Sequence, residues 1–187
     1  FSIYIPLLLF LSFTLLPIYW MLVTALKPSR QIFEVPIRYL PKDPSLINFF
    51  DVWNFTMFPR YFVNSLLVAG TAAGATVLVA ILGGYAFSRY KFRFKNTVLI
   101  FFLITQMLPF VLLVIPLYTI FVRLGLINTH ASLMLAYTAL NIPFCTMMMA
   151  SFFDGIPVSL EECAMVDGAN LAQTMTRITI PLVLPGI

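Results

Sequence analysis

Four stretches of this chain contain no charged residue and are each long enough to cross a lipid bilayer. A helix needs about 20 apolar residues to span roughly 30 Å of hydrocarbon, and within lipid its backbone groups must be satisfied internally. Only 10% of the residues are charged, whereas soluble domains contain about 25%. The sequence therefore predicts an all-α integral membrane protein, with spans at approximately residues 3–26, 61–88, 97–122 and 131–153 and the start of a fifth near 178–187.

Two connections carry most of the charge outside these spans. Residues 27–60 form a long loop rich in proline and aromatic residues, in which 46–53 could be a short interfacial or docking helix. A packed loop that covers the helix ends is the alternative, and we favour it over a ligand site. The connection Arg89–Lys95 interleaves basic and aromatic residues. Its place between two spans explains that pattern as a membrane-surface loop and gives no reason to expect nucleic acid as a partner.

Small and polar residues inside the predicted spans indicate how the helices could pack. Gly70 and Gly74 provide a small surface for close helix packing, which we expect inside the bundle, although a contact with a second subunit is also possible. Gln106 and Asn141 place amides within spans that Pro109 and other prolines interrupt. These two amides could line a solute path, or the prolines could only shape the packing.

An acidic stretch at Ser159–Asn170 interrupts the apolar sequence near its end. Ser159 and Glu162 have the spacing of a capping box, and acidic residues are favoured in the first turn of a helix. Gly168 is suited to end this helix or to turn the chain into the next one. The stretch therefore predicts a short helix outside the membrane, with one mostly small face that another protein could approach: Leu160, Cys163, Ala164, Asp167 and Leu171.

Catalytic and metal-binding patterns are not found in the sequence. The two cysteines, Cys145 and Cys163, are far apart, and His130 is the only histidine. There is no phosphate-binding glycine-rich loop, so we expect neither an enzyme nor a resident cofactor or metal. An ion-coupled transporter or a channel is expected to bury charged residues, and the four spans contain none.

The acidic stretch also resembles a known motif. Glu162-Cys163-Ala164, then Gly168, then Ile178-x-Ile180-Pro181 is similar to the EAA loop of ATP-binding-cassette (ABC) importer permeases. Cys163 stands where that family usually has alanine, and Ile180 where it usually has leucine. Further segments resemble the carbohydrate-type, maltose-transporter-like permeases: Asn64-Ser65, Tyr85–Phe92 and Leu124–Thr129.

This resemblance implies a type I ABC importer transmembrane fold. Residues 1–187 would form a single ABC transmembrane domain, a fragment that lacks the C-terminal spans. It would work in a bacterial or archaeal plasma membrane. Its partners would be a second permease subunit, which forms a heterodimer with it, two ATP-binding cassette subunits and an extracellular solute-binding protein. The resemblance implies that the transported solute is a sugar, and a non-sugar solute is the alternative.

The resemblance also assigns the loops and their residues. Residues 27–60 would face outwards, whereas residues 154–176 would form the cytoplasmic coupling loop. Arg89–Lys95 would lie on that same inner side, because two spans separate it from the coupling loop. Contacts with the ATPase subunit would come from Glu161, Glu162, Ala164, Asp167 and Gly168.

Overall fold

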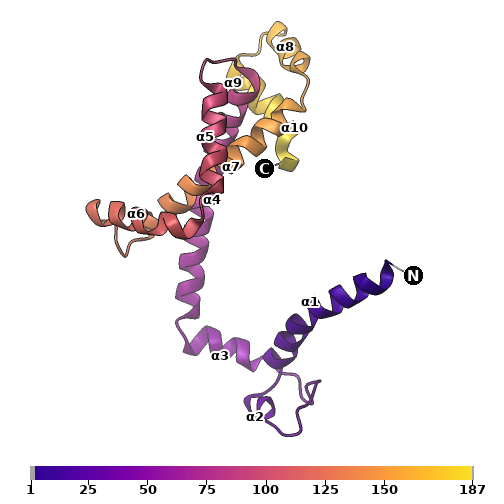
Figure 1. Ribbon diagram of the computed structural model, residues 1–187. Coiled ribbons are helices and arrows are strands. Elements are labelled where there is room, and N and C mark those ends of the chain that lie inside the picture. The colour runs from indigo at the N-terminus through magenta and orange to yellow at the C-terminus, as the bar shows by residue number, and fades with distance from the viewer. Residues whose placement is uncertain (1–2, 187) are drawn as a thin grey trace. The chain divides into compact units, whose positions relative to one another are not determined.

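The computed structural model describes residues 3–186, and within this range all regular structure is helical. The chain divides into two compact units, Phe1–Val63 and Asn64–Ile187. The first contains α1 (Tyr4–Ala25), α2 (Ser29–Ile32) and α3 (Ile47–Phe55). Helix α4 (Phe58–Arg89) begins at the end of the first unit and continues into the second (Figure 1).

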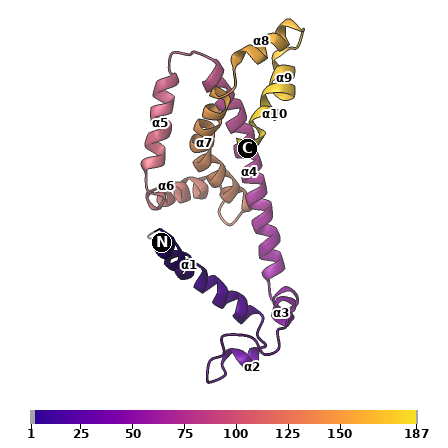
Figure 2. The same ribbon diagram turned by 90° about the vertical axis from the view of Figure 1, so that its right-hand side faces the viewer.

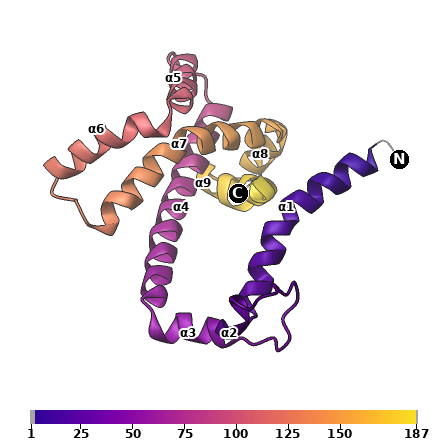
Figure 3. The same ribbon diagram turned by 60° about the horizontal axis from the view of Figure 1, so that its bottom comes forward.

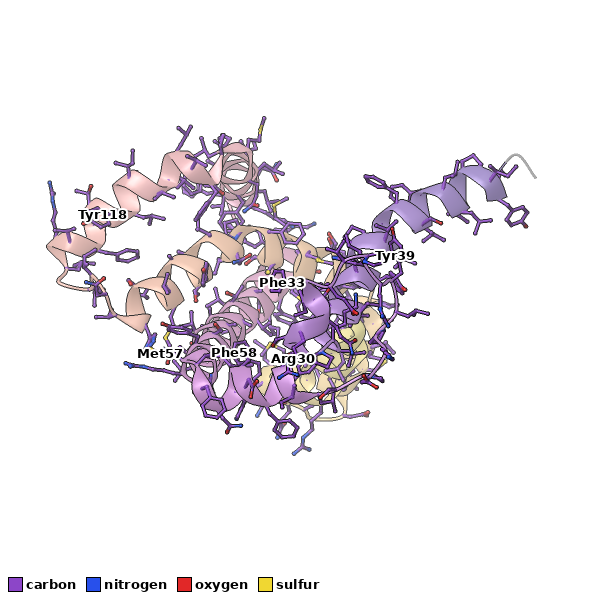
Figure 4. All side chains as sticks on the ribbon, turned by 90° about the horizontal axis from the view of Figure 1, so that it is seen from below. Arg30, Phe33, Tyr39, Met57, Phe58 and Tyr118 are labelled. Carbon is purple, nitrogen blue, oxygen red and sulfur yellow. The ribbon has the colours of Figure 1, made fainter. Side chains whose placement is uncertain are left out.

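The long loop of the first unit is tied to the end of α1. The Asn48 amide donates to the carbonyls of Ala25 and Lys27 at 2.8 and 2.7 Å, which satisfies acceptors that a helix end leaves open. The Lys27 ammonium lies 4.8 Å from the centre of the Trp20 ring and is buried. A helix, α3, forms where the sequence indicated one, while Phe33 and Tyr39 remain exposed on the preceding loop (Figure 4).

The second unit is centred on the crossing of α4 and α7 (His130–Asp154), which Figure 3 shows. A Cβ atom on Gly84 would lie 2.6 Å from Met149 Cβ and 2.9 Å from the Ala150 nitrogen, so only glycine permits this approach. Among the described residues, no atom from outside the neighbouring backbone of α4 lies within 4 Å of a Cβ built on Gly70 or Gly74. The close contact is therefore made at Gly84, and packing through Gly70 and Gly74 stays a prediction.

The third predicted span is bent rather than straight. Helix α5 (Lys95–Met107) and helix α6 (Phe110–Arg123) meet at 102° (Figure 2). Leu108 is extended because the ring of Pro109 disfavours helical backbone in the residue before it. Pro116 lies inside α6 without ending it. Within residues 3–186, α1, α4 and α7 are each long and apolar enough to cross a membrane, and the bent pair is a fourth candidate if counted as one span.

The C-terminal part of the second unit is a series of short helical segments. They are α8 (Val158–Val166), α9 (Leu171–Thr174), a π-helical turn (Met175–Thr179), α10 (Ile180–Val183) and a 3₁₀ turn (Leu184–Gly186). The Ile180 N–H donates to the Met175 carbonyl, five residues back, directly before Pro181, which has no N–H to donate. The predicted fifth span thus begins as broken helix, and Ile187 lies outside the described residues.

A small apolar core joins α4, α7 and this C-terminal part. Phe153 is fully buried, and its ring meets the Tyr85 ring edge-on at 5.6 Å between centres. Val183 of α10 packs into the same cluster, together with Met149 and Ile156. The core therefore holds together the end of the unit from which α8 projects.

Candidate functional site

Helix α8 has a clear start and stop, although the start differs from the prediction. Pro157 is its N-cap residue, and no side chain caps it, so the predicted Ser159–Glu162 capping box is wrong. Pro157 has the non-helical backbone of an N-cap residue, with φ −59° and ψ 128°, and α8 begins directly after it, one residue before Ser159. The capping box forms instead at α9, where Asn170 and Gln173 exchange side chain to backbone hydrogen bonds of 2.9 Å each.

The end of α8 depends on Gly168, as the sequence predicted. Gly168 has a φ of +91°, which is the left-handed conformation that favours glycine. The Ala169 N–H donates to the Ala164 carbonyl at 2.9 Å, and the Gly168 N–H donates to the Met165 carbonyl at 3.1 Å. This pair of bonds is the Schellman motif, and it stops α8 sharply before the turn into α9.

One face of α8 is buried, and its Glu161 is bound by side chains of α4. Glu161 is only 2% exposed, and Ala164, one turn further on, is also buried. Arg89 Nε donates to Glu161 Oε1 at 2.8 Å, and the Tyr85 hydroxyl donates to Glu161 Oε2 at 2.9 Å. Both oxygens of this carboxylate are thus bound by side chains from the last turns of α4.

The remaining donors of Arg89 reach the turn between α7 and α8. Arg89 Nη2 donates to the Ile156 carbonyl at 3.1 Å, and Nη1 donates to Ser88 Oγ at 3.0 Å. Ser88 in turn donates to Asp154, the last residue of α7. One guanidinium therefore connects α4 with α8 and the preceding turn, which the planar fork of arginine donors suits.

From the sequence, Arg89 was predicted only to be a membrane-surface cation, and its hydrogen bonds to Glu161 and the preceding turn were not predicted. The available signal was its position as the first charge after a long charge-free run, on the same side of the membrane as two adjacent carboxylates. The Arg89–Glu161 contact confirms that the α4–α5 connection and α8 lie at the same end of the second unit (Figure 1).

The opposite face of α8 is open. Glu162, Cys163 and Asp167 are exposed, and the Val166 side chain is 87% exposed. Of the residues predicted to contact an ATPase subunit, Glu162, Asp167 and Gly168 are therefore accessible, whereas Glu161 and Ala164 are not. The reason is helix geometry: residues 161 and 164 lie one turn apart on the same, buried face of α8.

The predicted path residues lie apart from this site. The Asn141 amide donates to the Tyr137 carbonyl at 2.7 Å, within α7, and the Gln106 amide approaches the Leu140 carbonyl at 3.4 Å. Asn141 lines a groove of about 370 Å³ between α4 and α7, whose α4 side consists of small residues and Val77, and Gln106 does not line it. Within residues 3–186, no group of three or more histidine, cysteine or acidic side chains could hold a metal ion.

Comparison with known proteins gives a consistent result. Residues 76–187 match the family model described as "Binding-protein-dependent transport system inner membrane component". The chain is 33% identical over 173 residues to the sulfoquinovosyl glycerol transport system permease protein SmoH of Agrobacterium fabrum, covering 92% of this chain and 61% of that protein. It is 37% identical over 186 residues to the inner membrane ABC transporter permease protein YcjP of Escherichia coli, covering 98% and 66%.

A relative from another genus and a solved structure agree. The diacetylchitobiose uptake system permease protein DasC of Streptomyces coelicolor is 32% identical over 171 residues, covering 91% of this chain and 62% of that protein. The crystal structure of a bacterial ABC transporter involved in the import of the acidic polysaccharide alginate contains a chain of the same fold, with a TM-score of 0.81 at 21% identity. That alignment covers 97% of this chain and 64% of the solved one, so this chain spans about three fifths to two thirds of the proteins it matches.

Proposed function

Because this chain belongs to the family of binding-protein-dependent transport system inner membrane components, we propose that α8 is the element through which an ATPase subunit drives its membrane helices. The chain is an ABC importer permease, a transport component and not an enzyme. The observation that carries the proposal is the two-sided character of α8. Its inner face is fixed by the buried Arg89–Glu161 pair, and its outer face is open at Glu162 and Val166.

The open face of α8 has the composition of a small docking surface. Glu162 offers a carboxylate that matches a basic group on the ATPase, and Val166, one turn later, offers an apolar contact beside it. A few residues carry most of the binding energy of an interface, so a surface of this size can be sufficient for docking. The helix stop at Gly168 keeps this surface short, so a cleft in the partner could enclose it.

The mechanism follows from linkage between two conformational equilibria. The permease alternates between inward-facing and outward-facing states, and the ATPase pair alternates between open and closed states. ATP binding can shift the permease only through contacts that differ between those states. Helix α8 would supply those contacts, and the membrane helices that follow its motion would open and close the solute path.

We further propose that the cargo is a sugar or a sugar derivative. Two relatives carry sulfoquinovosyl glycerol and diacetylchitobiose in their names, and both align with more than nine tenths of this chain. The complete importer would contain a second permease subunit, two ATP-binding cassette subunits and an extracellular solute-binding protein. Gln106 and Asn141 are candidates for contacts with the solute, and Asn141 already lines the groove between α4 and α7.

The proposal is tested by reversing the exposed charge in the complete permease. We expect Glu162→Lys to reduce solute uptake at least about tenfold, because it sets two positive groups against each other across the interface. Asp51→Lys is the matched control, since it makes the same charge change at an exposed position of α3. Uptake and ATP hydrolysis are measured together on the reconstituted importer.

The native Cys163 offers an independent measurement on the same face of α8. It is exposed, and a short thiol crosslinker should join it to the ATPase subunit, while Cys163→Ser should abolish that product. Full uptake by Glu162→Lys without a crosslinked product would contradict the docking proposal. Uptake that survives ATP depletion but stops with the ion gradient would instead indicate an ion-coupled transporter.

A further inference from the structure

We propose that Arg89 and Glu161 are positioning residues for coupling, because they join α8 to the last turns of α4 so that the two move as one rigid body. This inference rests on the proposed function, and it concerns the inward face of α8 rather than the face that meets the ATPase. Helix α4 would then be the membrane helix that first receives the motion of α8. The Tyr85 hydroxyl and the Ile156 carbonyl complete the connection.

The backbone around α8 cannot supply such a connection by itself. Gly155 lies in the turn that leads into α8, and Gly168 ends it with a φ of +91°. Within the described part of the chain, only Glu161 and Ala164 of the nine residues of α8 are buried. Helix α8 also contacts α9 and the π-helical turn, which follow it in the chain, and Glu161 provides its side-chain hydrogen bonds to α4. A push on the outer face would therefore reach α4 most directly through the side chains of Arg89 and Glu161.

The geometry of the pair is suited to transmit that push. The Arg89 and Glu161 side chains are only 8% and 3% exposed, so solvent does not compete for their hydrogen bonds. The carboxylate is held at both oxygens, and the guanidinium is held by α4, by the turn before α8 and by α8 itself. Separating the two side chains would leave a buried charge without its partner, which is far more costly than separating an exposed pair.

The two adjacent glutamates therefore have different tasks, and this difference can be measured. Glu162 contacts the ATPase, so its loss weakens docking. Glu161 holds α8 to α4, so its loss leaves docking intact while the motion of α8 no longer reaches α4. Loss of Glu161 should therefore give ATP hydrolysis that continues without matching uptake. A general loss of stability would not produce this combination.

The experiment uses the complete importer in proteoliposomes with Glu161→Gln, Arg89→Lys and Tyr85→Phe. We expect the first two to lower the solute transported per ATP hydrolysed at least about fivefold, which is the low end of coupling strengths between linked sites. Tyr85→Phe removes a single hydrogen bond and should lower the ratio less. The yield of the Cys163 crosslink to the ATPase subunit should stay at the level of the unmodified protein, because docking is not affected.

The outcomes separate this inference from the docking proposal. If Glu162→Lys uncouples the importer while Glu161→Gln and Arg89→Lys keep a normal ratio, the rigid-body inference is overturned and docking stands. If Glu162→Lys also transports normally, the docking proposal itself fails. If none of the three inner-face variants assembles with the ATPase, the pair serves folding, and the inference is overturned in that case too.

Discussion

The crossing of α4 and α7 should be intolerant of any side chain at Gly84. A Cβ atom there would lie 2.6 Å from Met149 Cβ and 2.9 Å from the Ala150 backbone nitrogen. Non-bonded carbon atoms are most stable at about 3.5 to 4.0 Å, so the two helices would have to separate by about 1 Å. Because one of the opposing atoms belongs to the backbone, a change of side-chain rotamer cannot relieve the contact.

The expected magnitude follows from two opposing effects. Overpacking of this kind costs about 1–3 kcal/mol, and a backbone contact places Gly84→Ala towards the upper end. Replacing glycine by alanine inside a helix gains about 0.5–1 kcal/mol, which offsets part of that cost. We therefore expect Gly84→Ala to destabilise the permease by about 1–2 kcal/mol, and Gly84→Val to destabilise it further.

Gly74 provides the matched control on the same helix. Among residues 3–186, no atom from outside the neighbouring backbone of α4 lies within 4 Å of a Cβ built on Gly74. Gly74→Ala should therefore keep only the gain in helix propensity. The assay is thermal unfolding of the purified permease in detergent at one fixed scan rate, because unfolding of such proteins is commonly irreversible. An unfolding temperature for Gly84→Ala equal to or above that of Gly74→Ala would refute the packing argument.

Two further predictions concern the ends of α8 and α9. Gly168→Val forces a β-branched residue into a left-handed conformation, so it should distort the end of α8 and reduce uptake. Gly168→Asn should retain most of the uptake, because asparagine tolerates that conformation. Equal uptake by the two variants would argue against backbone strain at this position. Asn170→Ala removes the capping box of α9 and should cost about 1 kcal/mol, seen as faster amide hydrogen exchange at the start of α9. Unchanged exchange there would show that tertiary contacts alone hold this turn.

Much of the architecture could be predicted because the apolar runs are long and the membrane permits few backbone structures. The break at Pro109 was predictable for the same local reason that extends Leu108. The angle of 102° between α5 and α6 was not predictable, because it depends on what these two helices pack against. The glycines show the same limit: Gly74 and Gly84 both lie on α4, and only the position of α7 decides which of them forms the contact.

The sequence predicted where the candidate site lies along the chain, but not which of its residues face inward. Glu161 and Glu162 are chemically identical neighbours, and successive residues of a helix point about 100° apart. Which of them faces inward depends on where α4 lies, and that could not be read from the acidic stretch. The capping box was misplaced for a related reason: Ser159 and Glu162 fit its spacing, but Pro157 already starts the helix. Local patterns therefore located α8, whereas the contact with Arg89 defined its faces.

The different roles proposed for Glu161 and Glu162 set a condition on coupling. A force that passes from the ATPase through the outer face of α8 into α4 crosses two contacts in series, so the weaker one limits what reaches the membrane. The inner contact is buried and bound at both carboxylate oxygens. Breaking it would leave a buried charge without its partner, so α8 should stay joined to α4 while the ATPase pushes or pulls on its outer face.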